Sequence, residues 1–172
     1  IRPGDRLLLV GDSLAQGLSV PLKQLATDQK VTFFGDSRVS TRIDQWSVQP
    51  WLAADVTTFG PSFIVVSLGT NDMKLANPLG EQPALNSLVA NLRNTGAIIL
   101  WLSPPTMPFT DNGVRSMLDS SVPLQFRSDQ LTIPRGSDGI HPTTVGYAGW
   151  AGLLWQYLAR GGGSTKRRNA VR

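Results

Sequence analysis

The chain has 172 residues, with 16 basic and 12 acidic side chains, a formal net charge of +4 and 41% hydrophobic residues. This length and composition suit one globular domain with a sizeable core. The absence of cysteine excludes disulfides, thiolate catalysis and cysteine-ligated zinc, and the single histidine excludes a multi-histidine metal site. No apolar run approaches the roughly 18 residues of a membrane span, so no transmembrane helix is expected.

The excess positive charge lies at the end of the sequence. Residues 161–172 read GGGSTKRRNAVR and hold four basic residues, which equal the whole net charge of +4. Because Gly-Gly-Gly-Ser is typical of flexible linkers, we interpret 161–172 as a basic flexible tail that follows a single domain, 1–160. A basic tail is also compatible with binding to nucleic acid or another acidic polymer.

The first half of the sequence predicts two strands and two helices. Residues 6–10 and 31–34 are continuous apolar runs, as expected for strands that are covered on both faces. Residues 15–28 and 46–57 are compatible with helices. Pro21 is expected to break or restart the first of these helices, with Ser19 as a possible cap.

The second half continues the alternation and then becomes less regular. Strands are predicted at 63–68 and 97–102, with a helix at 83–94 between them, where leucine and valine recur at helical spacing. Further on we expect a short helix near 114–120, a short edge strand near 130–133 and a final helix that ends near Arg160. The final helix contains three glycines at intervals of three residues, which predict close packing on the sheet: Gly146, Gly149 and Gly152.

Strands that alternate with helices indicate an α/β fold. The expected architecture is a three-layer α/β/α sandwich, with a flavodoxin-like parallel sheet of about five strands between two helical layers. Ligands of such sheets bind at the carboxyl ends of the strands, so the residues that follow each strand are the candidates for function.

Those positions hold the residue types of a serine hydrolase. Ser13 follows the first strand, although a serine there is more often a helix cap than a nucleophile. A serine nucleophile needs a base, and His141 is the only histidine; the base needs an orienting carboxylate, and Asp138 lies three residues before it. Asn71, after the third strand, offers an amide donor to an oxyanion.

Three sequence blocks carry a resemblance to a known family. They are GDSL at 11–14, GTND at 69–72 and DGIH at 138–141, and they lie in that order on the predicted strand pattern across residues 7–150. In these blocks the chain resembles the GDSL, or SGNH, hydrolases. The resemblance implies the fold of that family, a triad of Ser13, His141 and Asp138, two-step acyl transfer, and no metal or cofactor.

The oxyanion hole is the one feature in which the sequence departs from the family. The resemblance implies donors from the Ser13 N–H, the Asn71 amide and a glycine after the second strand. This chain has Gly35 directly after the strand and Ser40 five residues later, and alignment of the strand ends favours Ser40. A backbone N–H does not depend on the side chain, but serine adopts the required backbone conformations less readily than glycine.

The resemblance implies an esterase, and short acyl groups on a carbohydrate are the favoured substrate. The expected partner is therefore a small-molecule or polysaccharide ester, with no requirement for nucleic acid, and an extracellular or periplasmic site if the substrate is a polysaccharide. Five residues after the second strand are candidates to bind a sugar: Asp36, Ser37, Arg38, Arg42 and Trp46. For Trp46, packing in the core is the equally weighted interpretation.

Two other functions remain open at this point. A lipase- or thioesterase-like enzyme would need an apolar acyl slot, for which Met73, Leu75 and Met107 are the candidates. A non-catalytic flavodoxin-like module would instead use the glycine-containing turns to bind phosphate. The absence of a nucleotide-binding glycine motif after the first strand counts against this second function.

Overall fold

The computed structural model describes residues 1–161, and the proposed tail lies outside them apart from Gly161. Its centre is a five-stranded sheet of order β2-β1-β3-β4-β5 in which every paired neighbour is parallel. The strands are β1 (Arg6–Gly11), β2 (Thr32–Ser37), β3 (Phe63–Ser67), β4 (Ile98–Leu102) and β5 (Gln125–Phe126).

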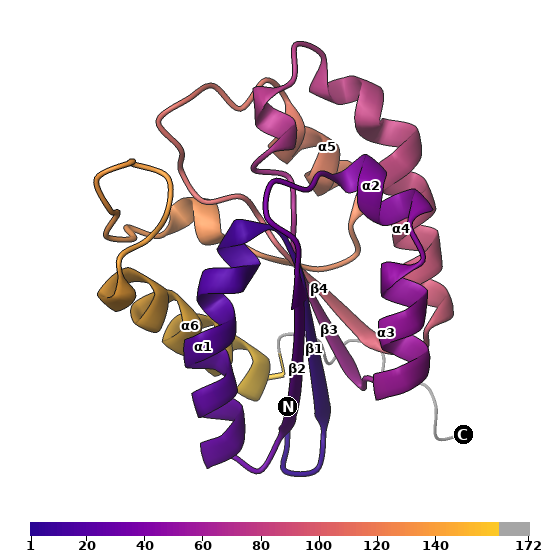
Figure 1. Ribbon diagram of the computed structural model, residues 1–172, viewed down its shortest axis with the longest axis vertical. Helices are drawn as coiled ribbons and strands as arrows, with labels where there is room; N and C mark the ends of the chain where they lie inside the picture. Colours follow the sequence, from indigo (N-terminus) through magenta and orange to yellow (C-terminus); the bar gives the residue numbers. More distant parts are fainter. Residues whose placement is uncertain (162–172) are drawn as a thin grey trace.

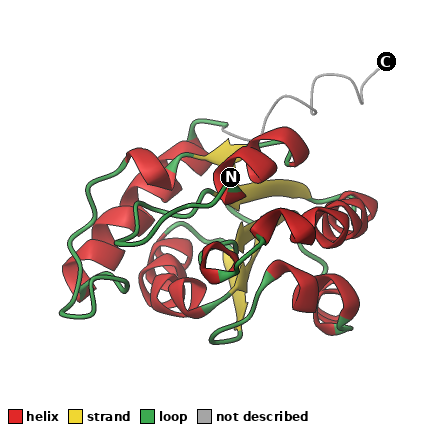
Figure 2. Ribbon diagram, turned by 90° about the horizontal axis from the view of Figure 1, so that it is seen from above, coloured by secondary structure: helices red, strands yellow, loops and turns green. Residues whose placement is uncertain are grey.

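Helices cover both faces of this sheet, as Figures 1 and 2 show. Helices α1 (Ser13–Asp28) and α6 (Thr144–Ala159) pack together on one face. The other face carries α2 (Ile43–Val48), α3 (Trp51–Phe59) and α4 (Gln82–Asn94), with α5 (Val114–Ser121) beside α4. The predicted three-layer α/β/α architecture is therefore confirmed.

The central strands are fully apolar because both of their faces are covered. Leu7, Leu8 and Leu9 of β1 have no exposed surface, and all five residues of β3 are buried. β2 lies at an edge and alternates between exposed and half-buried residues along its first half. The carboxyl ends of β1, β2 and β3 lie in register, so the loops that follow them meet at one edge of the sheet.

Two predictions about helix continuity are wrong. α1 runs through Pro21 without interruption, because its buried face packs on the sheet and on α6, and Ser19 donates to the Ala15 carbonyl inside the helix instead of capping a new one. The segment 46–57 is two helices rather than one. Pro50 disfavours a helical conformation at the preceding Gln49, which is extended, and α3 begins immediately after the proline.

The edge strand and the glycine repeat also differ from expectation. The fifth strand is Gln125–Phe126, and residues 128–130 form a short 3₁₀ helix instead. In α6 only Gly146 makes a close approach, to the Pro134 carbonyl, whereas a side chain at Gly149 or Gly152 would meet open space. A close contact between α1 and α6 is made by another glycine, Gly17 of α1, whose missing Cβ leaves room for the ring of Tyr147 in α6.

Candidate active site

The nucleophile candidate lies where β1 turns into α1. Gly11 ends the strand against the backbone of Ser67, and a Cβ at Gly11 would lie 2.1 Å from the Ser67 carbonyl oxygen, so only glycine fits. Asp12 then caps α1, because its Oδ1 accepts the Leu14 N–H at 2.9 Å. Ser13 is the first residue of α1, where unpaired N–H groups and the helix dipole favour negative charge.

The structure brings Ser13, His141 and Asp138 together in one chain of hydrogen bonds. Nε2 of His141 lies 2.9 Å from Ser13 Oγ, and Nδ1 of His141 lies 2.6 Å from Asp138 Oδ2. With the proton on Nδ1, Nε2 is free to accept the proton of the serine hydroxyl. This is the geometry in which a serine–histidine–carboxylate set activates a nucleophile.

Asp138 is held as a carboxylate by its own turn. Its Oδ1 accepts the backbone N–H groups of Ile140 and His141, each at 2.9 Å. The hydrogen bond to the His141 side chain and these two backbone bonds lower the pKa of Asp138 to about 2. One side chain thus shapes the turn with one oxygen and orients the imidazole with the other.

Ser40 lies in the turn that follows β2 and has a left-handed backbone conformation, with φ of 63°. The turn is closed by the Thr41 N–H, which donates to the Arg38 carbonyl at 3.2 Å. Gly35 instead lies within β2, paired with Leu9 and two residues before the end of the strand. Serine adopts this conformation less readily than glycine, which adopts it without strain.

Asn71 connects this turn to the start of α1. Its Nδ2 donates to the Thr41 carbonyl at 3.0 Å and lies 3.4 Å from Asp12 Oδ2. The amide therefore lies between the loops that follow β1 and β2. The amide has two N–H groups and both have acceptors here, so it would donate to an oxyanion at Ser13 in place of the longer contact to Asp12.

Two buried carboxyl groups lie beneath the candidate site. Burial raises the pKa of Asp12 to about 7, against the lowering effect of the Leu14 N–H, and the nearby Asp72 adds to the rise. Burial likewise raises the pKa of Asp72 to about 6. Asp72 Oδ1 accepts the Ile43 N–H at 3.1 Å, so this carboxyl group holds the start of α2 against the segment that follows β3.

Of the side chains predicted to line the cleft, Trp46 is buried, whereas Arg38 and Arg42 are partly exposed and paired with carboxylates. Trp46 is in the core, with its Nε1 donating to Thr41 Oγ1 at 2.9 Å, so the core-packing interpretation is correct and the cleft-lining one is wrong. Arg38 is partly exposed, pairs with Asp36 at 2.7 Å and lies over the ring of Trp51. Arg42 pairs with Asp44 at 2.9 Å.

The candidates for an acyl slot are mostly enclosed. Met73 and Met107 are 1% and 9% exposed and belong to the hydrophobic core, while Leu75 is half-buried.

Several contributors to the site have no sequence signal. Thr41 accepts from Asn71 through its carbonyl and Ile43 donates to Asp72 through its N–H, and any residue type supplies these backbone groups. Arg135 binds two backbone carbonyls near His141 and was not singled out by any motif. The burial of Asp12 follows from the turn between a buried strand and a buried helix, which the pattern LLLVGDSLA does indicate.

Residues 1–161 include no group of three or more histidine, aspartate or glutamate side chains placed to hold a metal ion. None of the helices in that part of the chain is both long and apolar enough to cross a membrane.

No family model matches the sequence, and no curated protein matches it. Solved structures do share its fold. The acetyl xylan esterase AlAXEase is 15% identical, with a TM-score of 0.71 over 89% of this chain and 99% of its own. A variant of Axe2, an acetyl xylan esterase from Geobacillus stearothermophilus, is 14% identical, with a TM-score of 0.67 over 91% and 95% of the two chains.

A third structure is a psychrotrophic esterase, EstA from Pseudoalteromonas sp., inhibited by monoethylphosphonate. It is 16% identical, with a TM-score of 0.65 over 91% of this chain and 97% of its own. At these identities the likeness establishes the fold, and it extends over nearly the whole of each protein.

Proposed function

Since this chain has the fold of the GDSL/SGNH-like hydrolases, we propose that it is a serine esterase. The observation that carries the proposal is the continuous set of contacts from Ser13 Oγ to His141 Nε2, at 2.9 Å, and from His141 Nδ1 to Asp138 Oδ2, at 2.6 Å. A serine that is merely a helix cap needs neither contact.

The reaction would proceed in two steps. His141 takes the proton from Ser13 Oγ as that oxygen attacks the ester carbonyl, and Asp138 stabilises the imidazolium. The backbone N–H groups of Ser13 and Ser40 and the Asn71 amide would stabilise the oxyanion. His141 then protonates the leaving alcohol, and water attacks the acyl-enzyme with the same general-base assistance.

A serine-directed phosphonate tests this assignment directly. It should form one adduct per wild-type chain, on the peptide that contains Ser13. Ser13→Ala should keep the fold and lose both the adduct and ester hydrolysis. Ser137→Ala, which removes an exposed serine beside Asp138, is the matched control and should keep both. An adduct that persists on Ser13→Ala would contradict the assignment.

We further propose that the acyl group is short, with acetyl the simplest case, and that the alcohol is a carbohydrate. Two observations support this choice. Met73 and Met107 are nearly fully buried in the core and leave little surface for a long acyl chain. The carboxyl end of β2 and the residue after it present the partly exposed, polar side chains of Asp36, Ser37 and Arg38, which suit a hydrated alcohol.

Chain-length preference separates this substrate from that of a lipase- or thioesterase-like enzyme. kcat/KM on p-nitrophenyl esters should fall from acetate to octanoate, and acetylated xylan or another acetylated polysaccharide should release acetate. A real acyl slot would add about 0.8 kcal/mol of binding for each buried methylene, so kcat/KM would rise with chain length. A steady rise without acetate release would make the enzyme lipase- or thioesterase-like.

A further inference from the structure

The turn that carries Asp138 and His141 lies at the surface of the domain. None of the residues 134–141 is fully buried, and the side chains of His141 and Asp138 are 43% and 48% exposed. Of residues 134–141 only Ile140 packs against the hydrophobic core, and it is only partly buried. Polar contacts are therefore needed to fix the position of this turn relative to Ser13.

Hydrogen bonds within the turn fix its shape. The Gly136 N–H donates to the His141 carbonyl at 2.8 Å, and the Gly139 N–H donates to the Gly136 carbonyl at 3.0 Å. Arg135 and Pro142 form an antiparallel bridge at the base of the turn. These bonds join residues of the same segment, so they do not attach it to the loops at the carboxyl edge of the sheet.

The side chain of Arg135 supplies that attachment. Its Nη1 donates to the carbonyl of Ile140, the residue directly before His141, and its Nη2 donates to the Thr106 carbonyl at 3.0 Å. The planar guanidinium suits this task because it holds two donors in a fixed fork. Arg135 thereby joins the catalytic turn to the loop that follows β4.

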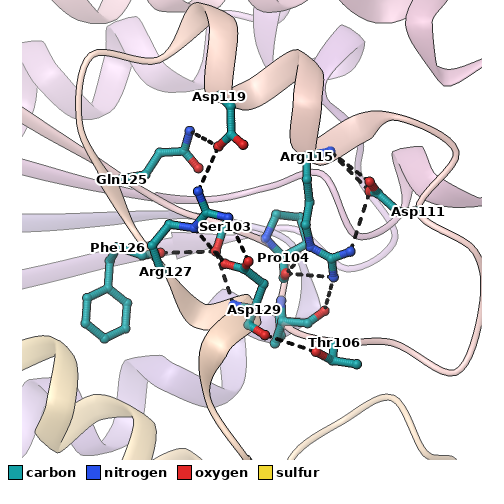
Figure 3. Close-up of polar contacts among 11 residues, drawn as sticks. Ser103, Pro104, Thr106, Asp111, Arg115, Asp119, Gln125, Phe126, Arg127 and Asp129 are labelled. Atoms are coloured by element: carbon teal, nitrogen blue, oxygen red, sulfur yellow. Dashed lines mark hydrogen bonds and ion pairs between the residues drawn. The ribbon is translucent and has the colours of Figure 1, made fainter.

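The loop after β4 is itself firmly held, as Figure 3 shows. Thr106 Oγ1 donates to the Asp129 carbonyl at 3.1 Å, and Ser103 Oγ lies 2.5 Å from Asp129 Oδ1. Arg115 of α5 donates to the carbonyls of Pro104, at 3.1 Å, and Pro105, at 2.9 Å. Arg135 is therefore bound to a segment that is anchored to β4, to α5 and to the 3₁₀ helix Ser128–Gln130.

We infer that Arg135 is a positioning residue for the proposed reaction, which holds the His141 imidazole within reach of Ser13 through the Ile140 carbonyl. This inference rests on the proposed esterase function. Arg135 acts through the turn and not on the substrate. Its loss should lower kcat and leave substrate binding nearly unchanged, because a displacement of about 1 Å in a catalytic group can cost about a hundredfold in rate.

The kinetic test compares Arg135→Ala and Arg135→Lys with wild type on p-nitrophenyl acetate. We expect kcat of Arg135→Ala to fall about ten- to a hundredfold with KM within about twofold. Arg135→Lys keeps the charge but not the fork, so it should recover only part of the rate. Arg93→Ala, which removes an exposed arginine of α4, is the control and should behave as wild type.

Chemical rescue distinguishes positioning from general destabilisation. Millimolar guanidinium chloride should raise kcat of Arg135→Ala several-fold, because the ion can occupy the space between the two carbonyls, and sodium chloride at the same concentration should not. His141→Ala should gain nothing from guanidinium. A rate of Arg135→Ala within about twofold of wild type would overturn the inference, as would a loss seen only in KM.

Hydrogen exchange gives a readout that does not depend on turnover. Backbone amides of 136–141 should exchange faster in Arg135→Ala than in wild type, and amides of β1 should be unchanged. If the wild-type chain hydrolysed no ester, the proposed function would fail, and exchange alone would then decide whether Arg135 holds the turn. Unchanged exchange at 136–141 would contradict the inference that Arg135 holds this turn in place.

Discussion

Nε2 of His141 lies 2.9 Å from Ser13 Oγ although the two residues are 128 positions apart in the chain. The fold makes this contact possible: Ser13 follows the inner strand β1, and His141 lies just before α6, which packs on α1. The nucleophile is thus the first residue of α1, and the base lies in the turn before α6, a helix of the same layer.

The first prediction concerns this contact. His141→Ala should lower kcat by about 10²–10⁴-fold, which is the usual contribution of a general base, with a small change in KM. The measurement is steady-state hydrolysis of p-nitrophenyl acetate, with circular dichroism as the check on the fold. A variant that retained more than about a hundredth of the wild-type kcat would contradict general-base catalysis by His141.

The second prediction concerns the oxyanion hole. Asn71→Ala should lower kcat by about 10²–10³-fold with little change in KM, because the amide would act only on the charge that forms in the transition state. Asn91→Ala, at an exposed position of α4, should leave both constants unchanged. A rise in KM at constant kcat would reassign Asn71 to substrate binding.

Much of the fold follows from the sequence because its central strands are continuous apolar runs. RLLLV and FIVVSL are covered on both faces, so their burial and their strand character have the same cause. The fifth strand differs from the predicted 130–133 because its two paired residues, Gln125 and Phe126, give no periodicity. The sequence predicts one helix across Pro50 because the apolar pattern continues from α2 into α3.

The candidate site divides along a similar line. Residues with chemically distinctive side chains, such as Ser13, Asn71 and His141, are visible in short blocks. The structure places His141 in contact with Ser13, and Asn71 in contact with Asp12, the residue before Ser13. Arg135 is not visible, because its partners are backbone carbonyls of Thr106 and Ile140 that any sequence provides. Trp46 was ambiguous because an indole near a strand end suits either a sugar site or the core.

The third prediction uses the buried carboxyl group of Asp12. Its pKa is raised from 3.8 to about 7, chiefly by burial, so between about pH 4 and pH 7 the folded chain keeps a proton that the unfolded chain has lost. The contribution of Asp12 to the free energy of unfolding therefore decreases as pH rises through this window. Asp12→Asn keeps an oxygen to accept the Leu14 N–H and removes the titration.

The measurement is the thermal midpoint of wild type and Asp12→Asn from pH 4 to pH 8. The thermal midpoint of Asp12→Asn should increase relative to that of wild type as pH rises, and most of this increase should be complete just above pH 7. Burial also raises the pKa values of Asp55, Asp72 and Glu81, but all three groups are present in both proteins, so the difference between the two midpoints reports chiefly on Asp12. A difference in thermal midpoint that stays constant with pH would contradict the raised pKa of Asp12.

The last prediction contrasts two helical glycines, Gly17 and Gly149. Gly149 lies at an exposed position of α6 where a Cβ would meet nothing within 4 Å, so Gly149→Ala should raise the free energy of unfolding by about 0.5–1 kcal/mol. A Cβ at Gly17 would lie 2.0–2.4 Å from three ring atoms of Tyr147. Gly17→Ala must therefore displace that ring, which stacks near Trp150, and should destabilise the fold by about 1–3 kcal/mol.

Urea denaturation of both variants measures this difference in stability, and a double-mutant cycle identifies its cause. On a Tyr147→Ala background the clash is absent, so Gly17→Ala should there be neutral or stabilising, as at Gly149. If Gly17→Ala stabilised the wild-type chain as much as Gly149→Ala does, this result would contradict the close contact between Gly17 of α1 and Tyr147 of α6.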